Sequence, residues 1–234
     1  MAVKMPSVVD DRVEHLLRSE AERIVAVSED RDNFSQYQFF LSDFARQDLF
    51  GMSIGNRRIY ISYRLASLAL RDSGQLWVLR QTVAHEIAHE TAGHAKQERV
   101  KWLNAGMFNL GASGGDVGLP WYMRLYNYST DKEIEADRIG LGYWNKLGWD
   151  CQIWVRILET FQEQNYIGDS FHPTDKRLQQ AQNVCELDFG GREIRSTKSQ
   201  SETISHGQTK ENFRHAPSGF GVSDFDIRIS NVAP

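Results

Sequence analysis

The stretch His85-Glu86-Ile87-Ala88-His89 constrains this chain more than any other, because it reads H-E-x-x-H. In an α-helix each residue turns by about 100°, so residues four apart lie on one face. His85 and His89 can therefore offer two imidazole nitrogens to one ion, and neutral imidazole suits zinc. Glu86 projects beside that face, where its carboxylate can act on a metal-bound water without binding the metal.

The residues around this motif favour a helix. From residue 75 to residue 102 there is no proline and one glycine, Gly93. Apolar residues recur at the three- and four-residue spacing of a helix face: Leu76, Leu79, Val83 and Ile87. Asp72 and Ser73 are candidate caps at the start. We expect a helix over residues 74–96. The alternative is an amphipathic helix that carries two histidines by chance.

Catalytic zinc usually has three protein ligands and a water. In one known pattern, H-E-x-x-H-x-x-G-x-x-H, the third ligand is a histidine six residues after the second. Here the corresponding glycine and histidine positions are Ala92 and Ala95. His94 is one residue off and lies about 140° around the helix from His89. We therefore expect His94 to support the site or the fold and not to bind the metal.

The other known arrangement takes a glutamate from a later helix. Glu133 and Asp137 are four residues apart and share one helix face. We expect Glu133 to bind the metal and Asp137 to accept a hydrogen bond from a ligating histidine. Glu135 points away from that face and is expected to be solvated or salt-bridged. The alternative is an acidic first turn that complements the helix dipole, which explains Glu133 and Glu135 better than Asp137.

Apolar periodicity predicts five further helices, over residues 8–28, 63–71, 130–147 and 151–164, and from Pro173 to about Val184. Residues 36–63 predict two or three strands with a hairpin at Gly55-Asn56. Thr130 with Glu133 fits a capping box. Residues 103–120 are rich in glycine and predict a loop near the site. We expect a domain over 1–189 and a polar, flexible tail over 190–234.

Composition excludes several classes of protein. The chain has 234 residues and a net charge of −4, and its basic residues are scattered, so nucleic acid is not an expected partner. No stretch approaches the roughly 18 apolar residues of a membrane span, and the first 20 residues lack the apolar core of a signal peptide. We expect a cytoplasmic protein as written, or a periplasmic one if the sequence is a mature or trimmed form.

The chain has two cysteines, Cys151 and Cys185, and no C-x-x-C motif. A cysteine zinc site is therefore not expected. The pair forms one disulfide if the protein resides outside the cytosol, or stays as two buried thiols.

Three motifs in this order and spacing carry a family resemblance: His85-Glu-Ile-Ala-His89, Glu133-Ile-Glu-Ala-Asp137-Arg-Ile-Gly and His172-Pro-x-x-x-Arg177. Over roughly residues 10–190 the chain resembles the soluble gluzincin zinc metallopeptidases of peptidase family M-forty-eight. That family includes the HtpX heat-shock proteases, the CAAX prenyl proteases and the BepA/LoiP-type proteases. The usual Asn-Ala-Phe-Ala segment is replaced here by residues 47–50, and the membrane helices of some branches are absent.

The resemblance implies a fold class: a compact, mostly helical α+β domain with a small sheet beside the zinc helix. It also implies Zn²⁺ as cofactor, with Glu133 as its third ligand and Asp137 behind a ligating histidine. His172 matches a histidine on a loop that can occlude the zinc, and Arg177 an arginine near the active site; both are candidate catalytic residues. The strand over residues 58–62 matches the edge strand along which such proteases bind extended peptides.

The expected function is zinc-dependent hydrolysis of peptide bonds, with protein or peptide substrates. The resemblance adds a role in quality control of unfolded or misassembled proteins. Two alternatives remain open. The first is a zinc-bound, chaperone-like or latent binding module whose site is occluded by the His172 loop, and the second is a metal-free helical interaction protein.

Overall fold

The computed structural model describes residues 7–44, 49–98, 128–164 and 174–197. The described residues form six labelled helices, a 3₁₀ helix and a small sheet. Their order is α1 (Asp11–Val25), η1 (Arg31–Gln36), β1 (Gln38–Ser42), β2 (Gly51–Ser53), β3 (Arg58–Ser62), α2 (Tyr63–Ala69), α3 (Ser73–Thr91), α6 (Thr130–Lys146), α7 (Cys151–Glu163) and α8 (Thr174–Thr197). This confirms the expected α+β class, mostly helical with a small sheet.

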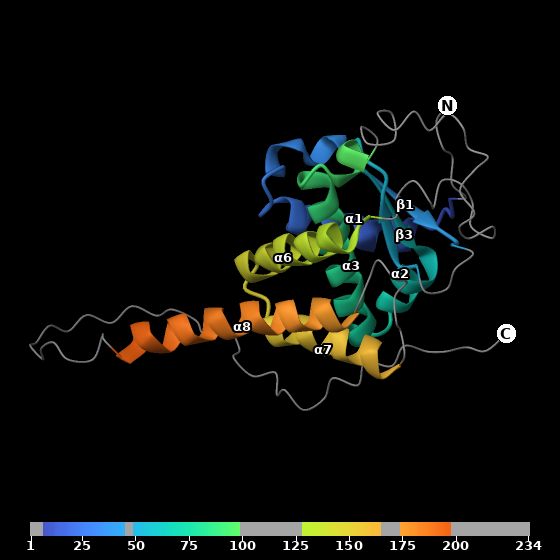
Figure 1. The fold of residues 1–234 in the computed structure, drawn as a ribbon. Helices are drawn as coiled ribbons and strands as arrows, with labels where there is room; N and C mark the ends of the chain where they lie inside the picture. Colours follow the sequence, from blue (N-terminus) through green and yellow to red (C-terminus); the bar gives the residue numbers. More distant parts are fainter. Residues whose placement is uncertain (1–6, 45–48, 99–127, 165–173, 198–234) are drawn as a thin grey trace, which may run out of the picture.

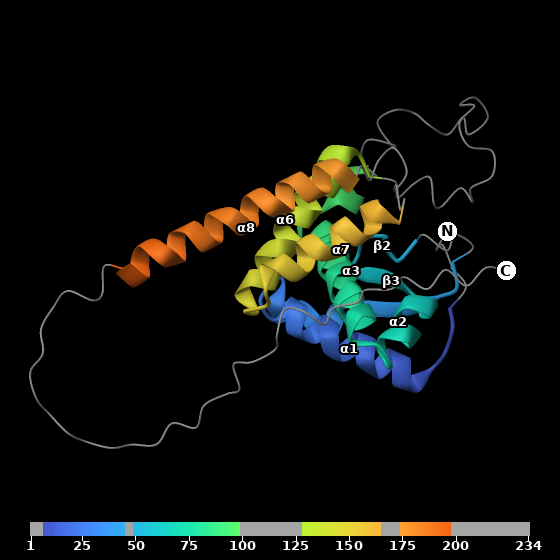
Figure 2. The same ribbon diagram turned by 90° about the horizontal axis from the view of Figure 1, so that it is seen from below.

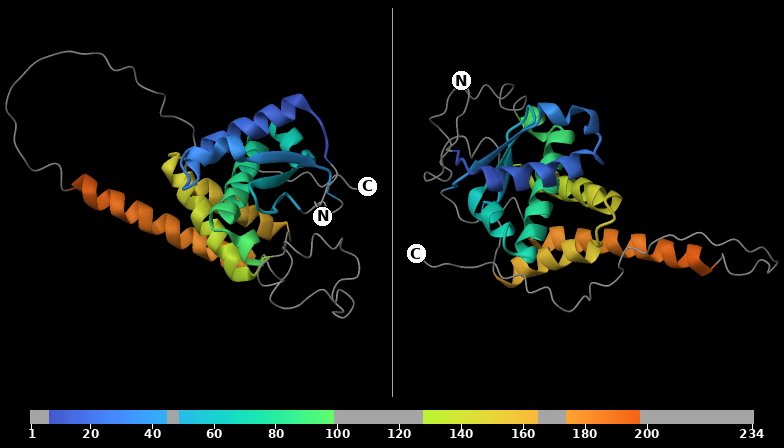
Figure 3. Two further views of the ribbon diagram at one scale, coloured as in Figure 1. Left: turned by 90° about the horizontal axis from the view of Figure 1, so that it is seen from above. Right: turned by 180° about the vertical axis from the view of Figure 1, so that it is seen from behind.

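Helix α3, which carries the H-E-x-x-H motif, runs through the middle of the molecule. The sheet, α1 and α2 lie on one side of it, and α6, α7 and α8 lie on the other (Figures 1 and 2). Val78, Leu79, Val83 and Ile87 of this helix are buried, and Leu76 and Trp77 are partly buried. The motif is therefore held inside the core and does not lie on an outer helix. The far end of α8 extends away from the rest of the domain (Figure 3).

The ends of α3 follow from local chemistry. Asp72 caps the start, because its Oδ1 accepts a hydrogen bond from the Gln75 N–H at 3.0 Å. The helix ends at Thr91, five residues before the expected end at 96. Gly93 has φ +69°, a left-handed conformation that ends a helix, and a new helical stretch covers 94–98. His94 therefore lies after the break and not on α3.

The sheet has three strands in the order β1-β3-β2. Strand β1 runs parallel to β3, and β2 runs antiparallel to it. The hairpin at Gly55-Asn56 is confirmed: Gly55, Asn56 and Arg57 have φ of 79°, 57° and 57°, as a tight turn requires. One expectation was wrong. The strand over 58–62 is the middle strand, and β2 is the edge strand that packs against α3.

The later helices match the predictions with two corrections. Ser129 occupies the N-cap position of α6 and Thr130 is already helical, so the predicted capping box is wrong. Gly148, with φ +71°, follows α6 as expected. Helix α8 continues past Val184 to Thr197. The glycine-rich segment 103–120, His172 and residues 198–234 lie outside the described residues.

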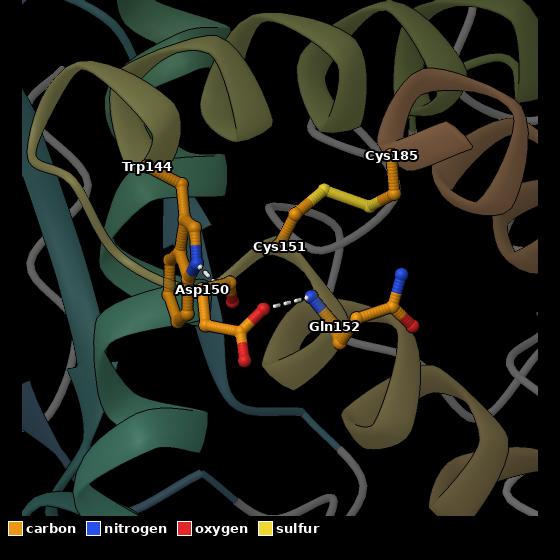
Figure 4. The surroundings of a disulfide bond; sticks show 5 residues. All are labelled: Trp144, Asp150, Cys151, Gln152 and Cys185. Carbon is orange, nitrogen blue, oxygen red and sulfur yellow. Dashed lines mark hydrogen bonds between the residues drawn. A yellow bond between two sulfur atoms is a disulfide. The ribbon is translucent and has the colours of Figure 1, made fainter. Parts of the chain in front are cut away.

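Cys151 and Cys185 form a disulfide that joins the start of α7 to α8 (Figure 4). Beside it, Asp150 caps α7 by accepting a hydrogen bond from the Gln152 N–H, and the Trp144 indole donates to the Asp150 carbonyl (Figure 4). The bond ties together the two helices that pack behind α3 and α6. In the described part of the chain, no helix combines the length and apolarity needed to cross a membrane.

Candidate metal centre

Three potential ligand atoms converge between α3 and α6. His85 Nε2 lies 3.0 Å from His89 Nε2 and 3.0 Å from Glu133 Oε2, and His89 Nε2 lies 3.4 Å from the same Glu133 oxygen. All three side chains are buried. The two histidines come from successive turns of α3, and Glu133 comes from the first turn of α6, which packs against α3. The structure thus brings together the three residues that the sequence predicts as metal ligands.

The separations of these atoms fit a zinc ion. Bonds of about 2.0 to 2.1 Å in a tetrahedral arrangement place ligand atoms about 3.3 Å apart. Two imidazole nitrogens and a carboxylate oxygen are ligand types that zinc accepts. A buried carboxylate facing two imidazole lone pairs at this range needs a cation or a proton between them. The residues present therefore fit the group that the sequence implies.

Asp137 and Arg177 lie behind His85, on the side away from the other two ligands. His85 Nδ1 lies 2.9 Å from Asp137 Oδ1. Arg177 on α8 donates from Nη2 to Asp137 Oδ1 at 2.9 Å and from Nε to Asp137 Oδ2. Burial works against a charged Asp137, but Arg177 and His85 hold the pKa of this carboxyl well below its usual range. Asp137 thus stays an anion that accepts the Nδ1 proton and leaves Nε2 free for a metal.

The same surroundings change the proton affinity of His85. Burial alone lowers its pKa, but the Asp137 and Glu133 carboxylates outweigh burial and raise the pKa of His85 to about 10 when no metal is bound. A metal ion must displace this proton in order to bind Nε2. This cluster of side chains therefore favours a positive charge, either a proton or a cation.

Glu86 and strand β2 are in direct contact. The Ser53 N–H donates to Glu86 Oε2 at 2.7 Å. Ile54 and Phe50 bond to β3. Ser53 lies at an alternate position of the strand, so its N–H and carbonyl point away from β3. A Cβ built on Gly51 would lie 2.8 Å from Glu86 Cγ, so only glycine lets β2 come this close to α3.

Tyr128 lies against His89, one of the three candidate ligands. Its ring stacks on His89 with a centroid distance of 4.2 Å and an interplanar angle of 19°. Its hydroxyl donates to the Ser53 carbonyl at 2.8 Å. Both outward-facing backbone groups of Ser53 are therefore engaged, one by Glu86 and one by Tyr128.

His94 lies behind His89. His94 Nδ1 is 2.8 Å from His89 Nδ1, and His94 Nε2 is 3.2 Å from Glu135 Oε2. His94 is completely buried, and burial together with the neighbouring His89 lowers the pKa of His94 to about 4. His94 is not among the three residues whose ligand atoms converge. Glu135 is half exposed and contacts His94.

Sequence reasoning missed three members of this site. Ser53 and Tyr128 carry no motif, because their roles come from a backbone amide and from a stacking contact between distant segments. Gly51 had a usable signal, since a glycine inside a strand marks close approach of another group. Of the predicted catalytic residues, Arg177 contacts Asp137, and His172 lies outside the described residues.

No protein-family model matches this chain, and the comparison with curated proteins found no match.

Proposed function

We propose that this chain is a zinc-dependent endopeptidase that hydrolyses peptide bonds in unfolded or misassembled proteins. The observation that carries the proposal is the convergence of His85, His89 and Glu133 on one point, with Glu86 on the same helix. The resemblance to the family M-forty-eight gluzincins supports the same reading. The preference for unfolded proteins rests on that resemblance alone.

In this mechanism His85, His89 and Glu133 would hold the zinc. When bound, zinc lowers the pKa of a coordinated water toward about 7 and polarises a carbonyl group. Glu86 takes the proton of the attacking water and delivers it to the leaving amine. The Ser53 amide, 2.7 Å from Glu86 Oε2, orients this carboxylate. Asp137, held by Arg177, fixes the tautomer and direction of His85.

An extended substrate would pair with the outer edge of β2, the edge strand among the described residues, because main-chain groups there point away from β3. Thr82, Glu86 and Glu90 of α3 lie against this strand. Use of this edge requires that the Tyr128 hydroxyl release the Ser53 carbonyl to the substrate, while the Ser53 N–H stays on Glu86. A peptide bound there would lie beside Glu86, which contacts the strand through Ser53.

The deciding test compares Glu86→Gln with Glu90→Gln. The two glutamates lie one turn apart on α3, and both accept a hydrogen bond from Ser53. Glu86 accepts from the Ser53 N–H, and Glu90 accepts from the Ser53 Oγ. Zinc content is measured by elemental analysis, and cleavage is measured on casein. We expect about one zinc per chain in the parent and both variants. Loss of a general base lowers the rate about 10²–10⁴-fold, so only Glu86→Gln should lose cleavage.

Two results would contradict the proposal. If the purified parent protein, refolded with zinc, holds no metal, the chain is a metal-free interaction protein. If Glu86→Gln cleaves casein as fast as the parent, Glu86 is not the general base.

One observation favours the latent zinc-binding module as second candidate: both outward backbone groups of Ser53 are already occupied, by Glu86 and by Tyr128. In that case the parent holds zinc but does not cleave casein. Tyr128→Phe frees the Ser53 carbonyl and should then give measurable cleavage. If the parent cleaves casein without this change, the protein is not latent.

The disulfide supports an oxidising location, such as the periplasm. Disulfides persist mainly in such compartments, and Cys151 and Cys185 are paired and buried. Non-reducing mass analysis of protein isolated from its native source would test this. A free-thiol form there would contradict it.

A further inference from the structure

A line of side chains runs from the candidate metal centre to the surface through His89. His89 Nε2 faces His85 and Glu133, while His89 Nδ1, on the opposite side of the ring, lies 2.8 Å from His94 Nδ1. His94 Nε2 then lies 3.2 Å from Glu135 Oε2. His94 is completely buried, whereas the Glu135 side chain is half exposed.

The protons in this line have one consistent arrangement once His89 binds a metal through Nε2. A neutral imidazole that gives one lone pair to a metal carries its proton on the other nitrogen. His89 Nδ1–H must then donate to His94 Nδ1, which can accept only if it carries no proton. The proton of His94 therefore sits on Nε2, where it donates to the Glu135 carboxylate.

We propose that His94 and Glu135 are positioning residues that orient His89 for the metal, as Asp137 and Arg177 orient His85. The inference rests on the proposed zinc site. Each ligating histidine then has its own support: a carboxylate backed by arginine for His85, and an imidazole backed by carboxylate for His89. Since Glu135 is the only charged member of the second line and is half exposed, this support is the weaker of the two.

The position of His94 rules out a direct role as ligand in this arrangement. Its Nδ1 lies against the nitrogen of His89 that points away from His85 and Glu133. The break at Gly93 creates this placement, because φ +69° turns the chain so that His94 comes back against His89. On a continuous helix, His94 would lie about 140° away from it.

The first test reads the tautomers directly. Zinc-loaded protein labelled with ¹⁵N at histidine is examined by long-range ¹H–¹⁵N correlation NMR. We expect His89 to be protonated at Nδ1 and His94 at Nε2. A His94 ring that is protonated at Nδ1 in the zinc-loaded protein would overturn the proposal, because it cannot accept from His89.

The second test measures zinc affinity by competition with a chromophoric chelator. Loss of a group behind a zinc ligand typically weakens metal binding 10–100-fold, and we expect this for His94→Leu. His94→Asn places an amide oxygen near the Nδ1 position, so it should recover most of the affinity. Glu135→Gln should weaken binding less than His94→Leu. The matched control is His15→Leu, because His15 is an exposed histidine on α1.

The outcomes separate this inference from the proposed function. If the parent holds no zinc, both fail. If the parent holds zinc and His94→Leu binds it as tightly, only the positioning role fails. Thermal unfolding of the metal-free variants shows whether each is folded. If His94→Leu does not fold, two other measurements decide whether His94 positions His89. They are the zinc affinity of His94→Asn relative to the parent and the protonated ring nitrogens of His89 and His94 seen by NMR.

Discussion

Arg177 on α8 binds both carboxylate oxygens of Asp137 on α6, and Asp137 in turn contacts His85 on α3. The direction of one metal ligand therefore depends on a residue 92 positions later in the chain, by the numbering of His85 and Arg177. Asp137 is buried and Arg177 is largely shielded from solvent, so the Asp137 carboxylate cannot turn to water if Arg177 is lost. This relationship makes the packing of α8 part of the site.

Arg177→Met should destabilise the fold by about 3–5 kcal/mol, because it removes the guanidinium partner of the buried Asp137 carboxylate and leaves only His85 beside it. It should also weaken zinc binding, since Asp137 loses the group that fixes it. Urea unfolding and chelator competition measure the two effects. Arg138→Met, at an exposed position on the same helix as Asp137, should change stability by less than about 0.5 kcal/mol. Equal effects of Arg177→Met and Arg138→Met would contradict the stabilising contact of Arg177 with Asp137.

Removal of zinc should lower the thermal stability of the parent protein. A ligand that binds only the folded state stabilises it by about 4 kcal/mol when present at 1,000 times its Kd. The metal competes with the proton held by His85, whose pKa is raised to about 10, so affinity should fall as pH falls. Calorimetry with and without EDTA at several pH values measures this. Glu133→Gln should abolish the EDTA effect; a variant that keeps it would exclude Glu133 as a ligand.

Gly51→Ala should destabilise the protein by about 1–3 kcal/mol, as overpacking does. The new Cβ would lie 2.8 Å from both Glu86 Cγ and Thr82 Cγ2, so β2 must move away from α3. Casein cleavage should fall with it, because Glu86 loses its fixed amide donor. Gly142→Ala on α6 is the matched control, since nothing lies within 4 Å of its Cβ position. Gly142→Ala should stabilise the helix by up to about 1 kcal/mol. If Gly51→Ala also stabilised the protein, the close approach of β2 to α3 at Gly51 would be contradicted.

Asp30 should contribute pH-dependent stability at the hairpin. Hydrogen bonds from Arg57, which outweigh burial, lower the pKa of Asp30, and Arg57 Nε lies 2.7 Å from Asp30 Oδ2. In the acid range the unfolded state binds more protons, so this contribution is present above about pH 4 and is lost as pH falls through the folded pKa. Asp30→Asn should cost about 1–2 kcal/mol at pH 7.

The difference between the parent and Asp30→Asn should shrink below about pH 4 in urea unfolding measured across pH. Asp32→Asn is the control, because the Asp32 side chain is 90% exposed. It should show no measurable effect at any pH. A difference for Asp30→Asn that grows in acid would mean that the sign of the pKa shift is wrong.

Reduction of the Cys151–Cys185 disulfide should destabilise the protein. The bond closes a loop with a sequence separation of 34, and the loop-entropy relation predicts about 3–4 kcal/mol for that length. Urea unfolding with and without reductant measures the effect. The double variant Cys151→Ala, Cys185→Ala should match the reduced parent and should not respond to reductant. An oxidised parent that is no more stable than this variant would contradict the prediction.

The sequence alone determined the elements that have strong local signals. Helix α3 and its cap at Asp72, the turn at Gly55-Asn56 and the glycine after α6 follow from periodicity, side-chain capping and backbone freedom, which act within a few residues. The spacing of His85, His89 and Glu133 also predicted which residues meet, because one helix face fixes two of them.

Only the tertiary structure decided how the elements are paired and which distant groups support the site. Strand order placed β2 at the edge and β3 in the middle, and no local pattern encodes strand order. The contacts of Ser53 with Glu86 and of His94 with His89 arise where separate segments pack together. Their energies depend on burial and on distances of about 3 Å, and both are properties of the folded chain.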